Sequence, residues 1–129
     1  MKDEILILVV KDEMLLQALF EETLKDGGYD VKVVSTGEDA IKLLDADEPK
    51  YRALVTDVNL GRKVDGWDVA RRAREINADV PVVYITGHGA ADWASRGVPN
   101  SIVLTKPFAP AQLITAVSQL INTGQTPTQ

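Results

Sequence analysis

The chain has 129 residues, the usual size of one domain, with 45% hydrophobic and 26% charged residues, so we expect a single buried core rather than a disordered chain. The net charge of -5 argues against nucleic acid and against an anionic membrane surface as direct partners, because both bind positively charged surfaces. The sequence has no cysteine, which excludes disulfides, thiolate nucleophiles and cysteine-based metal sites.

The chain alternates two kinds of segment. Short apolar runs rich in β-branched residues are typical of strands buried on both faces of a sheet. Longer segments between them repeat apolar residues at helical spacing. In chain order, we expect a strand at residues 5–10, a helix at 13–26, a strand at 31–34, a helix at 37–46, a strand at 53–56, a helix at 66–76, a strand at 80–85, a short helix at 90–95, a strand at 102–104 and a helix at 110–121.

Residues at the ends of these segments support the boundaries. Gly27 and Gly28 end the first helix, Ser35 and Thr36 can cap the second, and Pro110 suits the first turn of the last. The polar tail is expected to be disordered and the apolar run near the N-terminus is too short for a signal peptide or a membrane span. We therefore expect one cytoplasmic domain at residues 1–122 and a tail at residues 123–129.

Alternation of this kind predicts an α/β fold, a parallel sheet with helices on both faces. Ligands of such sheets lie beyond the carboxyl ends of the strands. Four polar side chains follow four different predicted strands, namely Asp12, Asp57, Thr86 and Lys106. They supply two carboxylates, one hydroxyl and one ammonium at one edge of the sheet.

This set of groups suits one kind of chemistry. Two carboxylates and a backbone carbonyl can hold Mg²⁺ while it keeps several waters and takes a phosphate oxygen. A carboxylate can also form a covalent aspartyl phosphate. The ammonium and the hydroxyl can bind the remaining phosphate oxygens.

The segments ILILVVKDE, ALVTDVNL, DGWDVA, VVYITGHG and VLTKPF stand in this order along the chain. Together they resemble the chemotaxis-regulator-like receiver domain of two-component response regulators, over residues 3 to 122. The resemblance implies a doubly wound, five-stranded parallel sheet of flavodoxin-like strand order 2-1-3-4-5. It also implies a cis peptide bond between Lys106 and Pro107.

The resemblance also assigns the site. It implies Asp57 as the phosphoacceptor, Thr86 as the hydroxyl that moves toward the phosphate, and Lys106 as the cation that binds the phosphoryl group. It implies that Mg²⁺ is held by Asp12, Asp57 and the backbone carbonyl of Asn59. It further implies a phosphoprotein that assists its own Mg²⁺-dependent phosphorylation and dephosphorylation but is not otherwise an enzyme. The phosphodonor is then a histidine kinase or a phosphotransfer protein of a phosphorelay, and output goes through contact with another protein, since no output domain has room after residue 121.

Several positions depart from the family pattern. Lys11 replaces the first member of an acidic pair, so it opposes Mg²⁺ and can pair with Asp57 or Asp12. Val103 stands where an aromatic residue normally moves with the switch. The loop after Asp57 is one residue longer and has Gly61 in place of proline. The segment 87–101 is rich in glycine, so its helix is expected to be short or mobile.

Two alternatives stay open. The first is a pseudo-receiver, an interaction module that Lys11 has left with weak or no phosphorylation. The second is a flavodoxin-like cofactor binder. A flavin phosphate needs a hydroxyl- and glycine-rich loop after the first strand, whereas this chain carries Lys-Asp-Glu there.

Overall fold

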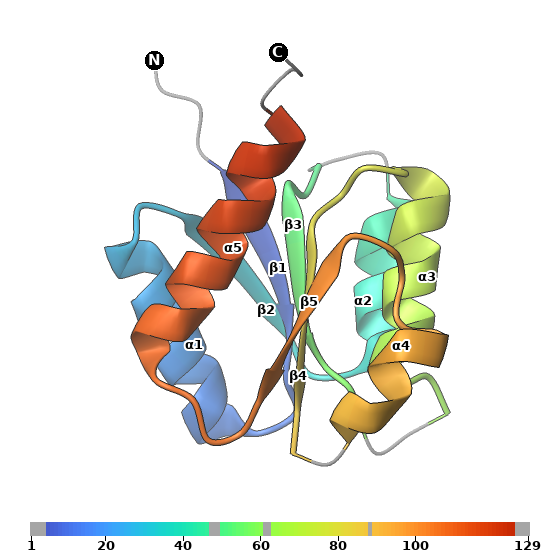
Figure 1. Cartoon of the computed structure of the whole chain (residues 1–129), viewed down its shortest axis with the longest axis horizontal. Coiled ribbons are helices and arrows are strands. Elements are labelled where there is room, and N and C mark those ends of the chain that lie inside the picture. The colour runs from blue at the N-terminus through green and yellow to red at the C-terminus, as the bar shows by residue number, and fades with distance from the viewer. Residues whose placement is uncertain (1–4, 47–49, 61–62, 88, 126–129) are drawn as a thin grey trace.

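The structure is a computed structural model that describes residues 5–46, 50–60, 63–87 and 89–125. Strands and helices alternate along the chain, as predicted (Figure 1). The elements are β1 (Leu6–Val10), α1 (Met14–Asp26), β2 (Asp30–Val34), α2 (Gly37–Asp45), β3 (Ala53–Asp57), α3 (Gly66–Ile76), β4 (Val82–Thr86), the 3-10 turn η1 (Gly89–Asp92), α4 (Trp93–Arg96), β5 (Ser101–Thr105) and α5 (Pro110–Gln125).

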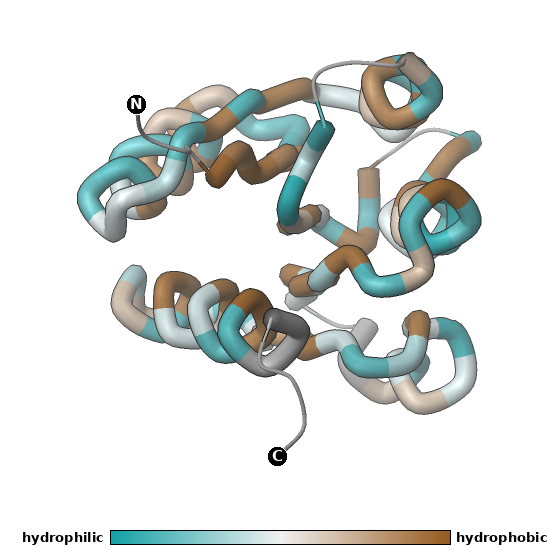
Figure 2. Tube along the Cα trace, turned by 90° about the horizontal axis from the view of Figure 1, so that it is seen from above, coloured by the Kyte–Doolittle hydropathy of each residue, from teal (hydrophilic) through white to brown (hydrophobic). Residues whose placement is uncertain are grey.

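The five strands form one sheet in the order β2-β1-β3-β4-β5, and every neighbouring pair is parallel. The predicted fold class and strand order are therefore confirmed. Helices α1 and α5 cover one face of the sheet, and α2, α3 and α4 cover the other (Figure 1). Seen from above, hydrophobic residues gather along the central strands between the two helical layers (Figure 2). This burial on both faces explains why β1 is a continuous apolar run and why β3 and β4 carry polar residues only toward their carboxyl ends.

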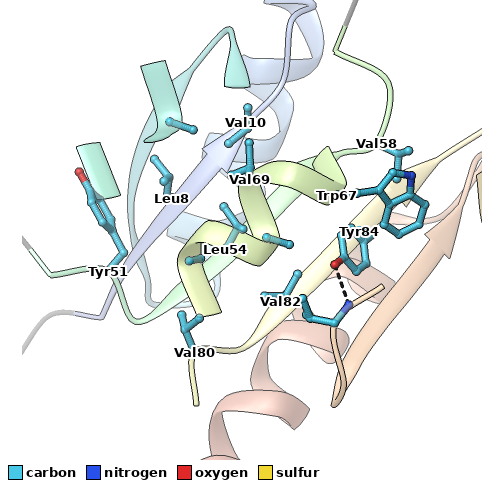
Figure 3. Close-up of a cluster of buried hydrophobic side chains, with 14 of the residues drawn as sticks. Leu8, Val10, Tyr51, Leu54, Val58, Trp67, Val69, Val80, Val82 and Tyr84 are labelled. Carbon is cyan, nitrogen blue, oxygen red and sulfur yellow. Dashed lines mark hydrogen bonds between the residues drawn. The ribbon is translucent and has the colours of Figure 1, made fainter. Parts of the chain in front are cut away.

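Each face of the sheet has its own core. On the α2–α3 face the indole of Trp67 lies 4.7 Å from the Tyr84 ring, between centroids (Figure 3). On the α1–α5 face Phe20 packs 6.0 Å from Phe108. Other buried members of the two cores include Leu8, Leu54, Val69 and Val82 on the first face and Ile7, Val55, Leu113 and Val117 on the second.

The predicted caps and boundaries need few changes. The Thr36 side chain accepts a hydrogen bond from the Asp39 backbone and caps α2, as predicted. Strand bounds shift by one or two residues. Helix α5 continues to Gln125 instead of ending at residue 121, so it includes the first three residues of the predicted tail. Residues 126–129 lie outside the described residues, and their predicted disorder stays a prediction.

The predicted short fourth helix is confirmed, since α4 has only 4 residues. Other groups hold the segment that precedes β5. The Arg74 guanidinium, from α3, donates to the carbonyls of Val80 at 2.7 Å, Pro99 at 2.6 Å and Asn100 at 3.2 Å. The Trp93 indole donates to the Ser101 hydroxyl at 2.8 Å. One arginine and one indole thus fix the approach to β5 in place of a long helix.

Candidate functional site

The carboxyl ends of the strands meet at the lower edge of the sheet in Figure 1. Asp57 is the last residue of β3 and is only 5% exposed. Thr86, the last residue of β4, is also buried and is paired in register with Thr105 of β5. Lys106 follows β5 directly. The structure therefore brings together the predicted phosphoacceptor, switch hydroxyl and phosphate-binding lysine.

The backbone of Asp57 is held by close packing against α3. Gly66, the first residue of that helix, donates its N–H to the Val58 carbonyl at 2.9 Å. A Cβ added at Gly66 would stand 2.2 Å from the Asp57 carbonyl oxygen. Val58 in turn donates its backbone N–H to Ile85 of β4 at 2.9 Å. Only glycine allows this approach, which fixes where the Asp57 side chain points.

Lys11 makes the closest contact with the Asp57 carboxylate. Its Nζ atom lies 2.8 Å from Asp57 Oδ2, and the whole lysine is 1% exposed. Its backbone is fixed on both sides. The Lys11 N–H donates to Val34 at 3.0 Å, and the Lys11 carbonyl accepts a hydrogen bond from the Gln17 amide, which also donates to Ser35 Oγ at 2.9 Å. Of the two partners that the sequence left open for Lys11, Asp57 and Asp12, the structure shows Asp57.

Lys106 approaches the other carboxylate oxygen from β5. Its Nζ atom lies 3.6 Å from Asp57 Oδ1, beyond hydrogen-bonding distance, and its side chain is 37% exposed. The Lys106 backbone N–H donates to the Thr86 carbonyl at 2.9 Å. The bond from Lys106 to Pro107 is cis, as predicted. The two oxygens of Asp57 therefore differ, since one is bonded to an ammonium and the other faces one at a longer distance.

The two lysines influence each other through the carboxylate that they share. Burial by itself lowers the pKa of Lys11, but the hydrogen bond and the attraction to Asp57 outweigh burial and raise this pKa above its ordinary value. Burial and the neighbouring Lys11 lower the pKa of Lys106. Lys11 is thus the more firmly charged of the two cations that flank Asp57.

The predicted magnesium set does not fit this conformation. Asp12 and Asn59, which flank Asp57 at the edge, are both exposed, and the Asp57 oxygen Oδ2 is already bonded to the Lys11 ammonium. A cation bonded to the carboxylate repels a dication that approaches either of its oxygens. Mg²⁺ would therefore have to bind against the charge of Lys11 or displace its ammonium from Oδ2.

Apolar surface borders these charged groups. Met14 and Leu15, in the first turn of α1, are 79% and 84% exposed. A groove of about 220 Å³ runs between α1 and the connection from β5 to α5, and its walls include Phe20, Lys106 and Pro107. Exposed apolar surface next to a charged site is typical of protein interaction sites.

Sequence reasoning missed one feature near the site. Tyr84 is buried on β4 directly beside Val103 of β5, and its hydroxyl accepts a hydrogen bond from the Val98 N–H at 3.0 Å (Figure 3). An aromatic ring is thus present, but on the strand next to the one where the family pattern has it. The VVYIT segment offered the signal, a tyrosine within a buried strand.

The sequence also singled out Gly61, in the loop after Asp57. This residue lies outside the described residues.

Comparison with known proteins agrees with this geometry. The family described as the response regulator receiver domain matches residues 7–118. A response regulator receiver protein from Sinorhizobium medicae is 50% identical, with a TM-score of 0.92 over 95% of this chain and 98% of that one. The receiver domain of the sensor histidine kinase PA1611 from Pseudomonas aeruginosa is 26% identical, with a TM-score of 0.77 over 93% of this chain and 99% of that one. It has a magnesium ion coordinated in its active site cleft.

A curated relative gives the same result. The transcriptional regulatory protein TcrA of Mycobacterium tuberculosis is 33% identical over 94% of this chain and 47% of its own length, so the chain spans about half of this relative. Among the described residues, no helix is long and apolar enough to cross a membrane. The match over residues 7–118, together with Asp57, Thr86 and Lys106 at the ends of their strands, shows that the chain belongs to the response regulator receiver domain family.

Proposed function

We propose that Asp57 accepts a phosphoryl group from a histidine kinase or from a phosphotransfer protein of a phosphorelay. The phosphorylated protein then signals by contact with another protein. The observation that carries this proposal is the Asp57 carboxylate at the carboxyl end of β3, with a lysine ammonium near each of its oxygens. Carboxylates of this kind form aspartyl phosphates when cations neutralise the transferred group.

Each neighbouring group has a role in this reaction. Asp57 is the nucleophile. Lys106, at the open side of the carboxylate and 37% exposed, binds phosphoryl oxygens. The Thr86 hydroxyl, at the end of the adjacent strand, moves toward the phosphate and carries the signal inward. The apolar surface formed by Met14 and Leu15 suits a protein as phosphodonor rather than a small molecule alone.

A magnesium ion on Asp12, Asp57 and the Asn59 carbonyl stays a prediction. The magnesium ion in the receiver domain of PA1611 supports it. The bond between Lys11 and Asp57 opposes it. The same bond favours the alternative of a pseudo-receiver, because it occupies an oxygen of the nucleophile.

Phosphoryl incorporation tests the proposal. The protein is incubated with acetyl phosphate and Mg²⁺, and intact mass is measured. We expect the mass of one added phosphoryl group on the parent protein and on Asp26→Asn, an exposed aspartate on α1, but not on Asp57→Asn. If the parent stays unlabelled while Lys11→Asp gains a label, the pseudo-receiver becomes the better assignment.

A further inference from the structure

We propose that the Lys11 ammonium is the resident cation of the phosphoacceptor site, so that Asp57 takes up a phosphoryl group without a divalent metal. This inference rests on the proposed function, since it concerns the same reaction at Asp57. The family pattern implies a metal, whereas the residues at this edge place the Lys11 ammonium against the Asp57 carboxylate. A positive charge held there repels a divalent cation that approaches the same carboxylate.

The two oxygens of Asp57 have different roles in this inference. Oδ2 is bonded to Lys11 Nζ at 2.8 Å, within hydrogen-bonding range. Lys106 Nζ lies 3.6 Å from Oδ1, beyond hydrogen-bonding distance, so Lys106 does not tie up the lone pairs of this oxygen. We therefore assign Oδ1 as the attacking atom. Lys106 stands beside that atom, where the phosphoryl oxygens arrive.

Lys11 is built into the site and does not reach it from solvent. The side chain is 1% exposed, and the residue is held through its N–H by Val34 and through its carbonyl by Gln17. Gln17 is itself fixed by its bond to Ser35. A charge fixed before the reaction stabilises a charged transition state without further reorganisation. A lysine held in this way can do part of what a bound cation does.

The transfer step balances without a metal. The bond from Asp57 Oδ1 to phosphorus forms as the bond from phosphorus to the donor oxygen breaks, and the electron pair of the broken bond leaves with acetate when acetyl phosphate is the donor. No proton is taken up or released. Both lysines keep their protons throughout. The dianionic phosphoryl group on Asp57 then faces two ammonium groups, Lys11 and Lys106, which match its charge.

The wild-type protein provides the first test. Phosphoryl incorporation from acetyl phosphate is followed by intact mass in Mg²⁺ and, separately, in EDTA. We expect the two rates to agree within about threefold, because a fixed ammonium already supplies the charge that a metal would add. Labelling in Mg²⁺ alone overturns the inference and leaves the proposed function standing. Labelling in neither condition overturns both.

The variant Lys11→Asp provides the matched control, since it restores an acidic pair with Asp12. We expect this variant to need Mg²⁺, with labelling at least about tenfold slower in EDTA. Asp57→Asn stays unlabelled in every condition. If Lys11→Asp is labelled in EDTA as fast as the wild type, the lysine has no part in the reaction and the inference is wrong.

Thermal unfolding gives a readout that does not depend on phosphorylation. A metal that binds the folded state raises Tm. We expect millimolar Mg²⁺ to leave the wild-type Tm unchanged within about 1 °C and to raise that of Lys11→Asp by several degrees. A Mg²⁺-dependent rise in the wild type equal to that in Lys11→Asp would show that the metal binds as well with Lys11 present as without it, against the inference.

Discussion

Strands β1 and β5 each bring a lysine to Asp57, and the two ends are built differently. After β1, Lys11 is buried, bonded to the carboxylate at 2.8 Å and fixed through its own backbone. After β5, Lys106 is 37% exposed and stands 3.6 Å from the other oxygen. The end of β1 thus holds the Lys11 ammonium in a fixed position, whereas the end of β5 lets the Lys106 ammonium move toward an incoming phosphoryl group.

The same contrast extends into the fold on either side of Asp57. Toward α3 the backbone is packed so closely that Gly66 leaves no space for a Cβ. Toward β5 the covering helix α4 has only 4 residues, and side-chain hydrogen bonds from Arg74 and Trp93 hold the segment before β5 instead. Movement after phosphorylation is therefore expected on the β4–β5 side, since fewer packed contacts have to change there.

The largest effect is expected from removing the fixed lysine. Lys11→Met leaves the Asp57 carboxylate buried without its hydrogen-bonded partner, so we expect the free energy of unfolding to fall by about 3 kcal/mol. Lys106→Met is the matched change at the end of β5. We expect it to lower the free energy of unfolding by about 0.5 kcal/mol, because Lys106 is 37% exposed and lies beyond hydrogen-bonding distance of Asp57. Urea unfolding measures both. Equal losses would mean that the two lysines are held alike.

A smaller effect is expected where α3 touches the backbone of Asp57. Gly66→Ala places a methyl group against the Asp57 carbonyl and the Val58 Cα atom, so the helix has to shift. We expect a loss of about 2 kcal/mol in the free energy of unfolding. Gly87→Ala, at the end of β4, is the control, because an added Cβ there meets nothing within 4 Å. A tolerated Gly66→Ala, with the control unchanged, would show that this side of the site can move.

Much of the fold could be predicted because parallel strands buried on both faces leave an unmistakable apolar run in the sequence. Strand order followed from the family resemblance. The length of α5 was underestimated, since residues 122–125 are polar or glycine and carry no helical periodicity. Loop glycines correctly predicted a short α4, because they disfavour a long helix.

The site could be predicted in composition but not in geometry. Asp57, Thr86 and Lys106 each follow a strand, and the ends of parallel strands meet at one edge. The sequence could not say whether Lys11 pairs with Asp57 or Asp12, since that depends on how residues 46 positions apart in the chain are packed. The amide of Gln17 on the Lys11 carbonyl is a contact of the same kind.

The smallest effect is expected from the hydroxyl of Tyr84. It tests whether the β4–β5 side of Asp57 is less firmly packed than the side that faces α3. Tyr84→Phe removes the acceptor of the buried Val98 N–H and leaves the ring against Trp67, so we expect a loss of about 1 kcal/mol in the free energy of unfolding. Tyr29→Phe breaks a less buried hydrogen bond to Ser118 on the other face and is expected to lose about half as much.

Hydrogen exchange places the effect of Tyr84→Phe within the fold. We expect faster exchange at the amides of β5 and of the segment that precedes it, while β1 and β3 keep their protection. The reason is that the lost hydrogen bond, from the Val98 N–H to the Tyr84 hydroxyl, holds only the segment before β5. Faster exchange throughout the sheet would mean that Tyr84 supports the core as a whole. The β4–β5 side and the β1 side of Asp57 would then open with the same free energy. In that case phosphorylation could not move β5 without also loosening β1, the strand that precedes Lys11.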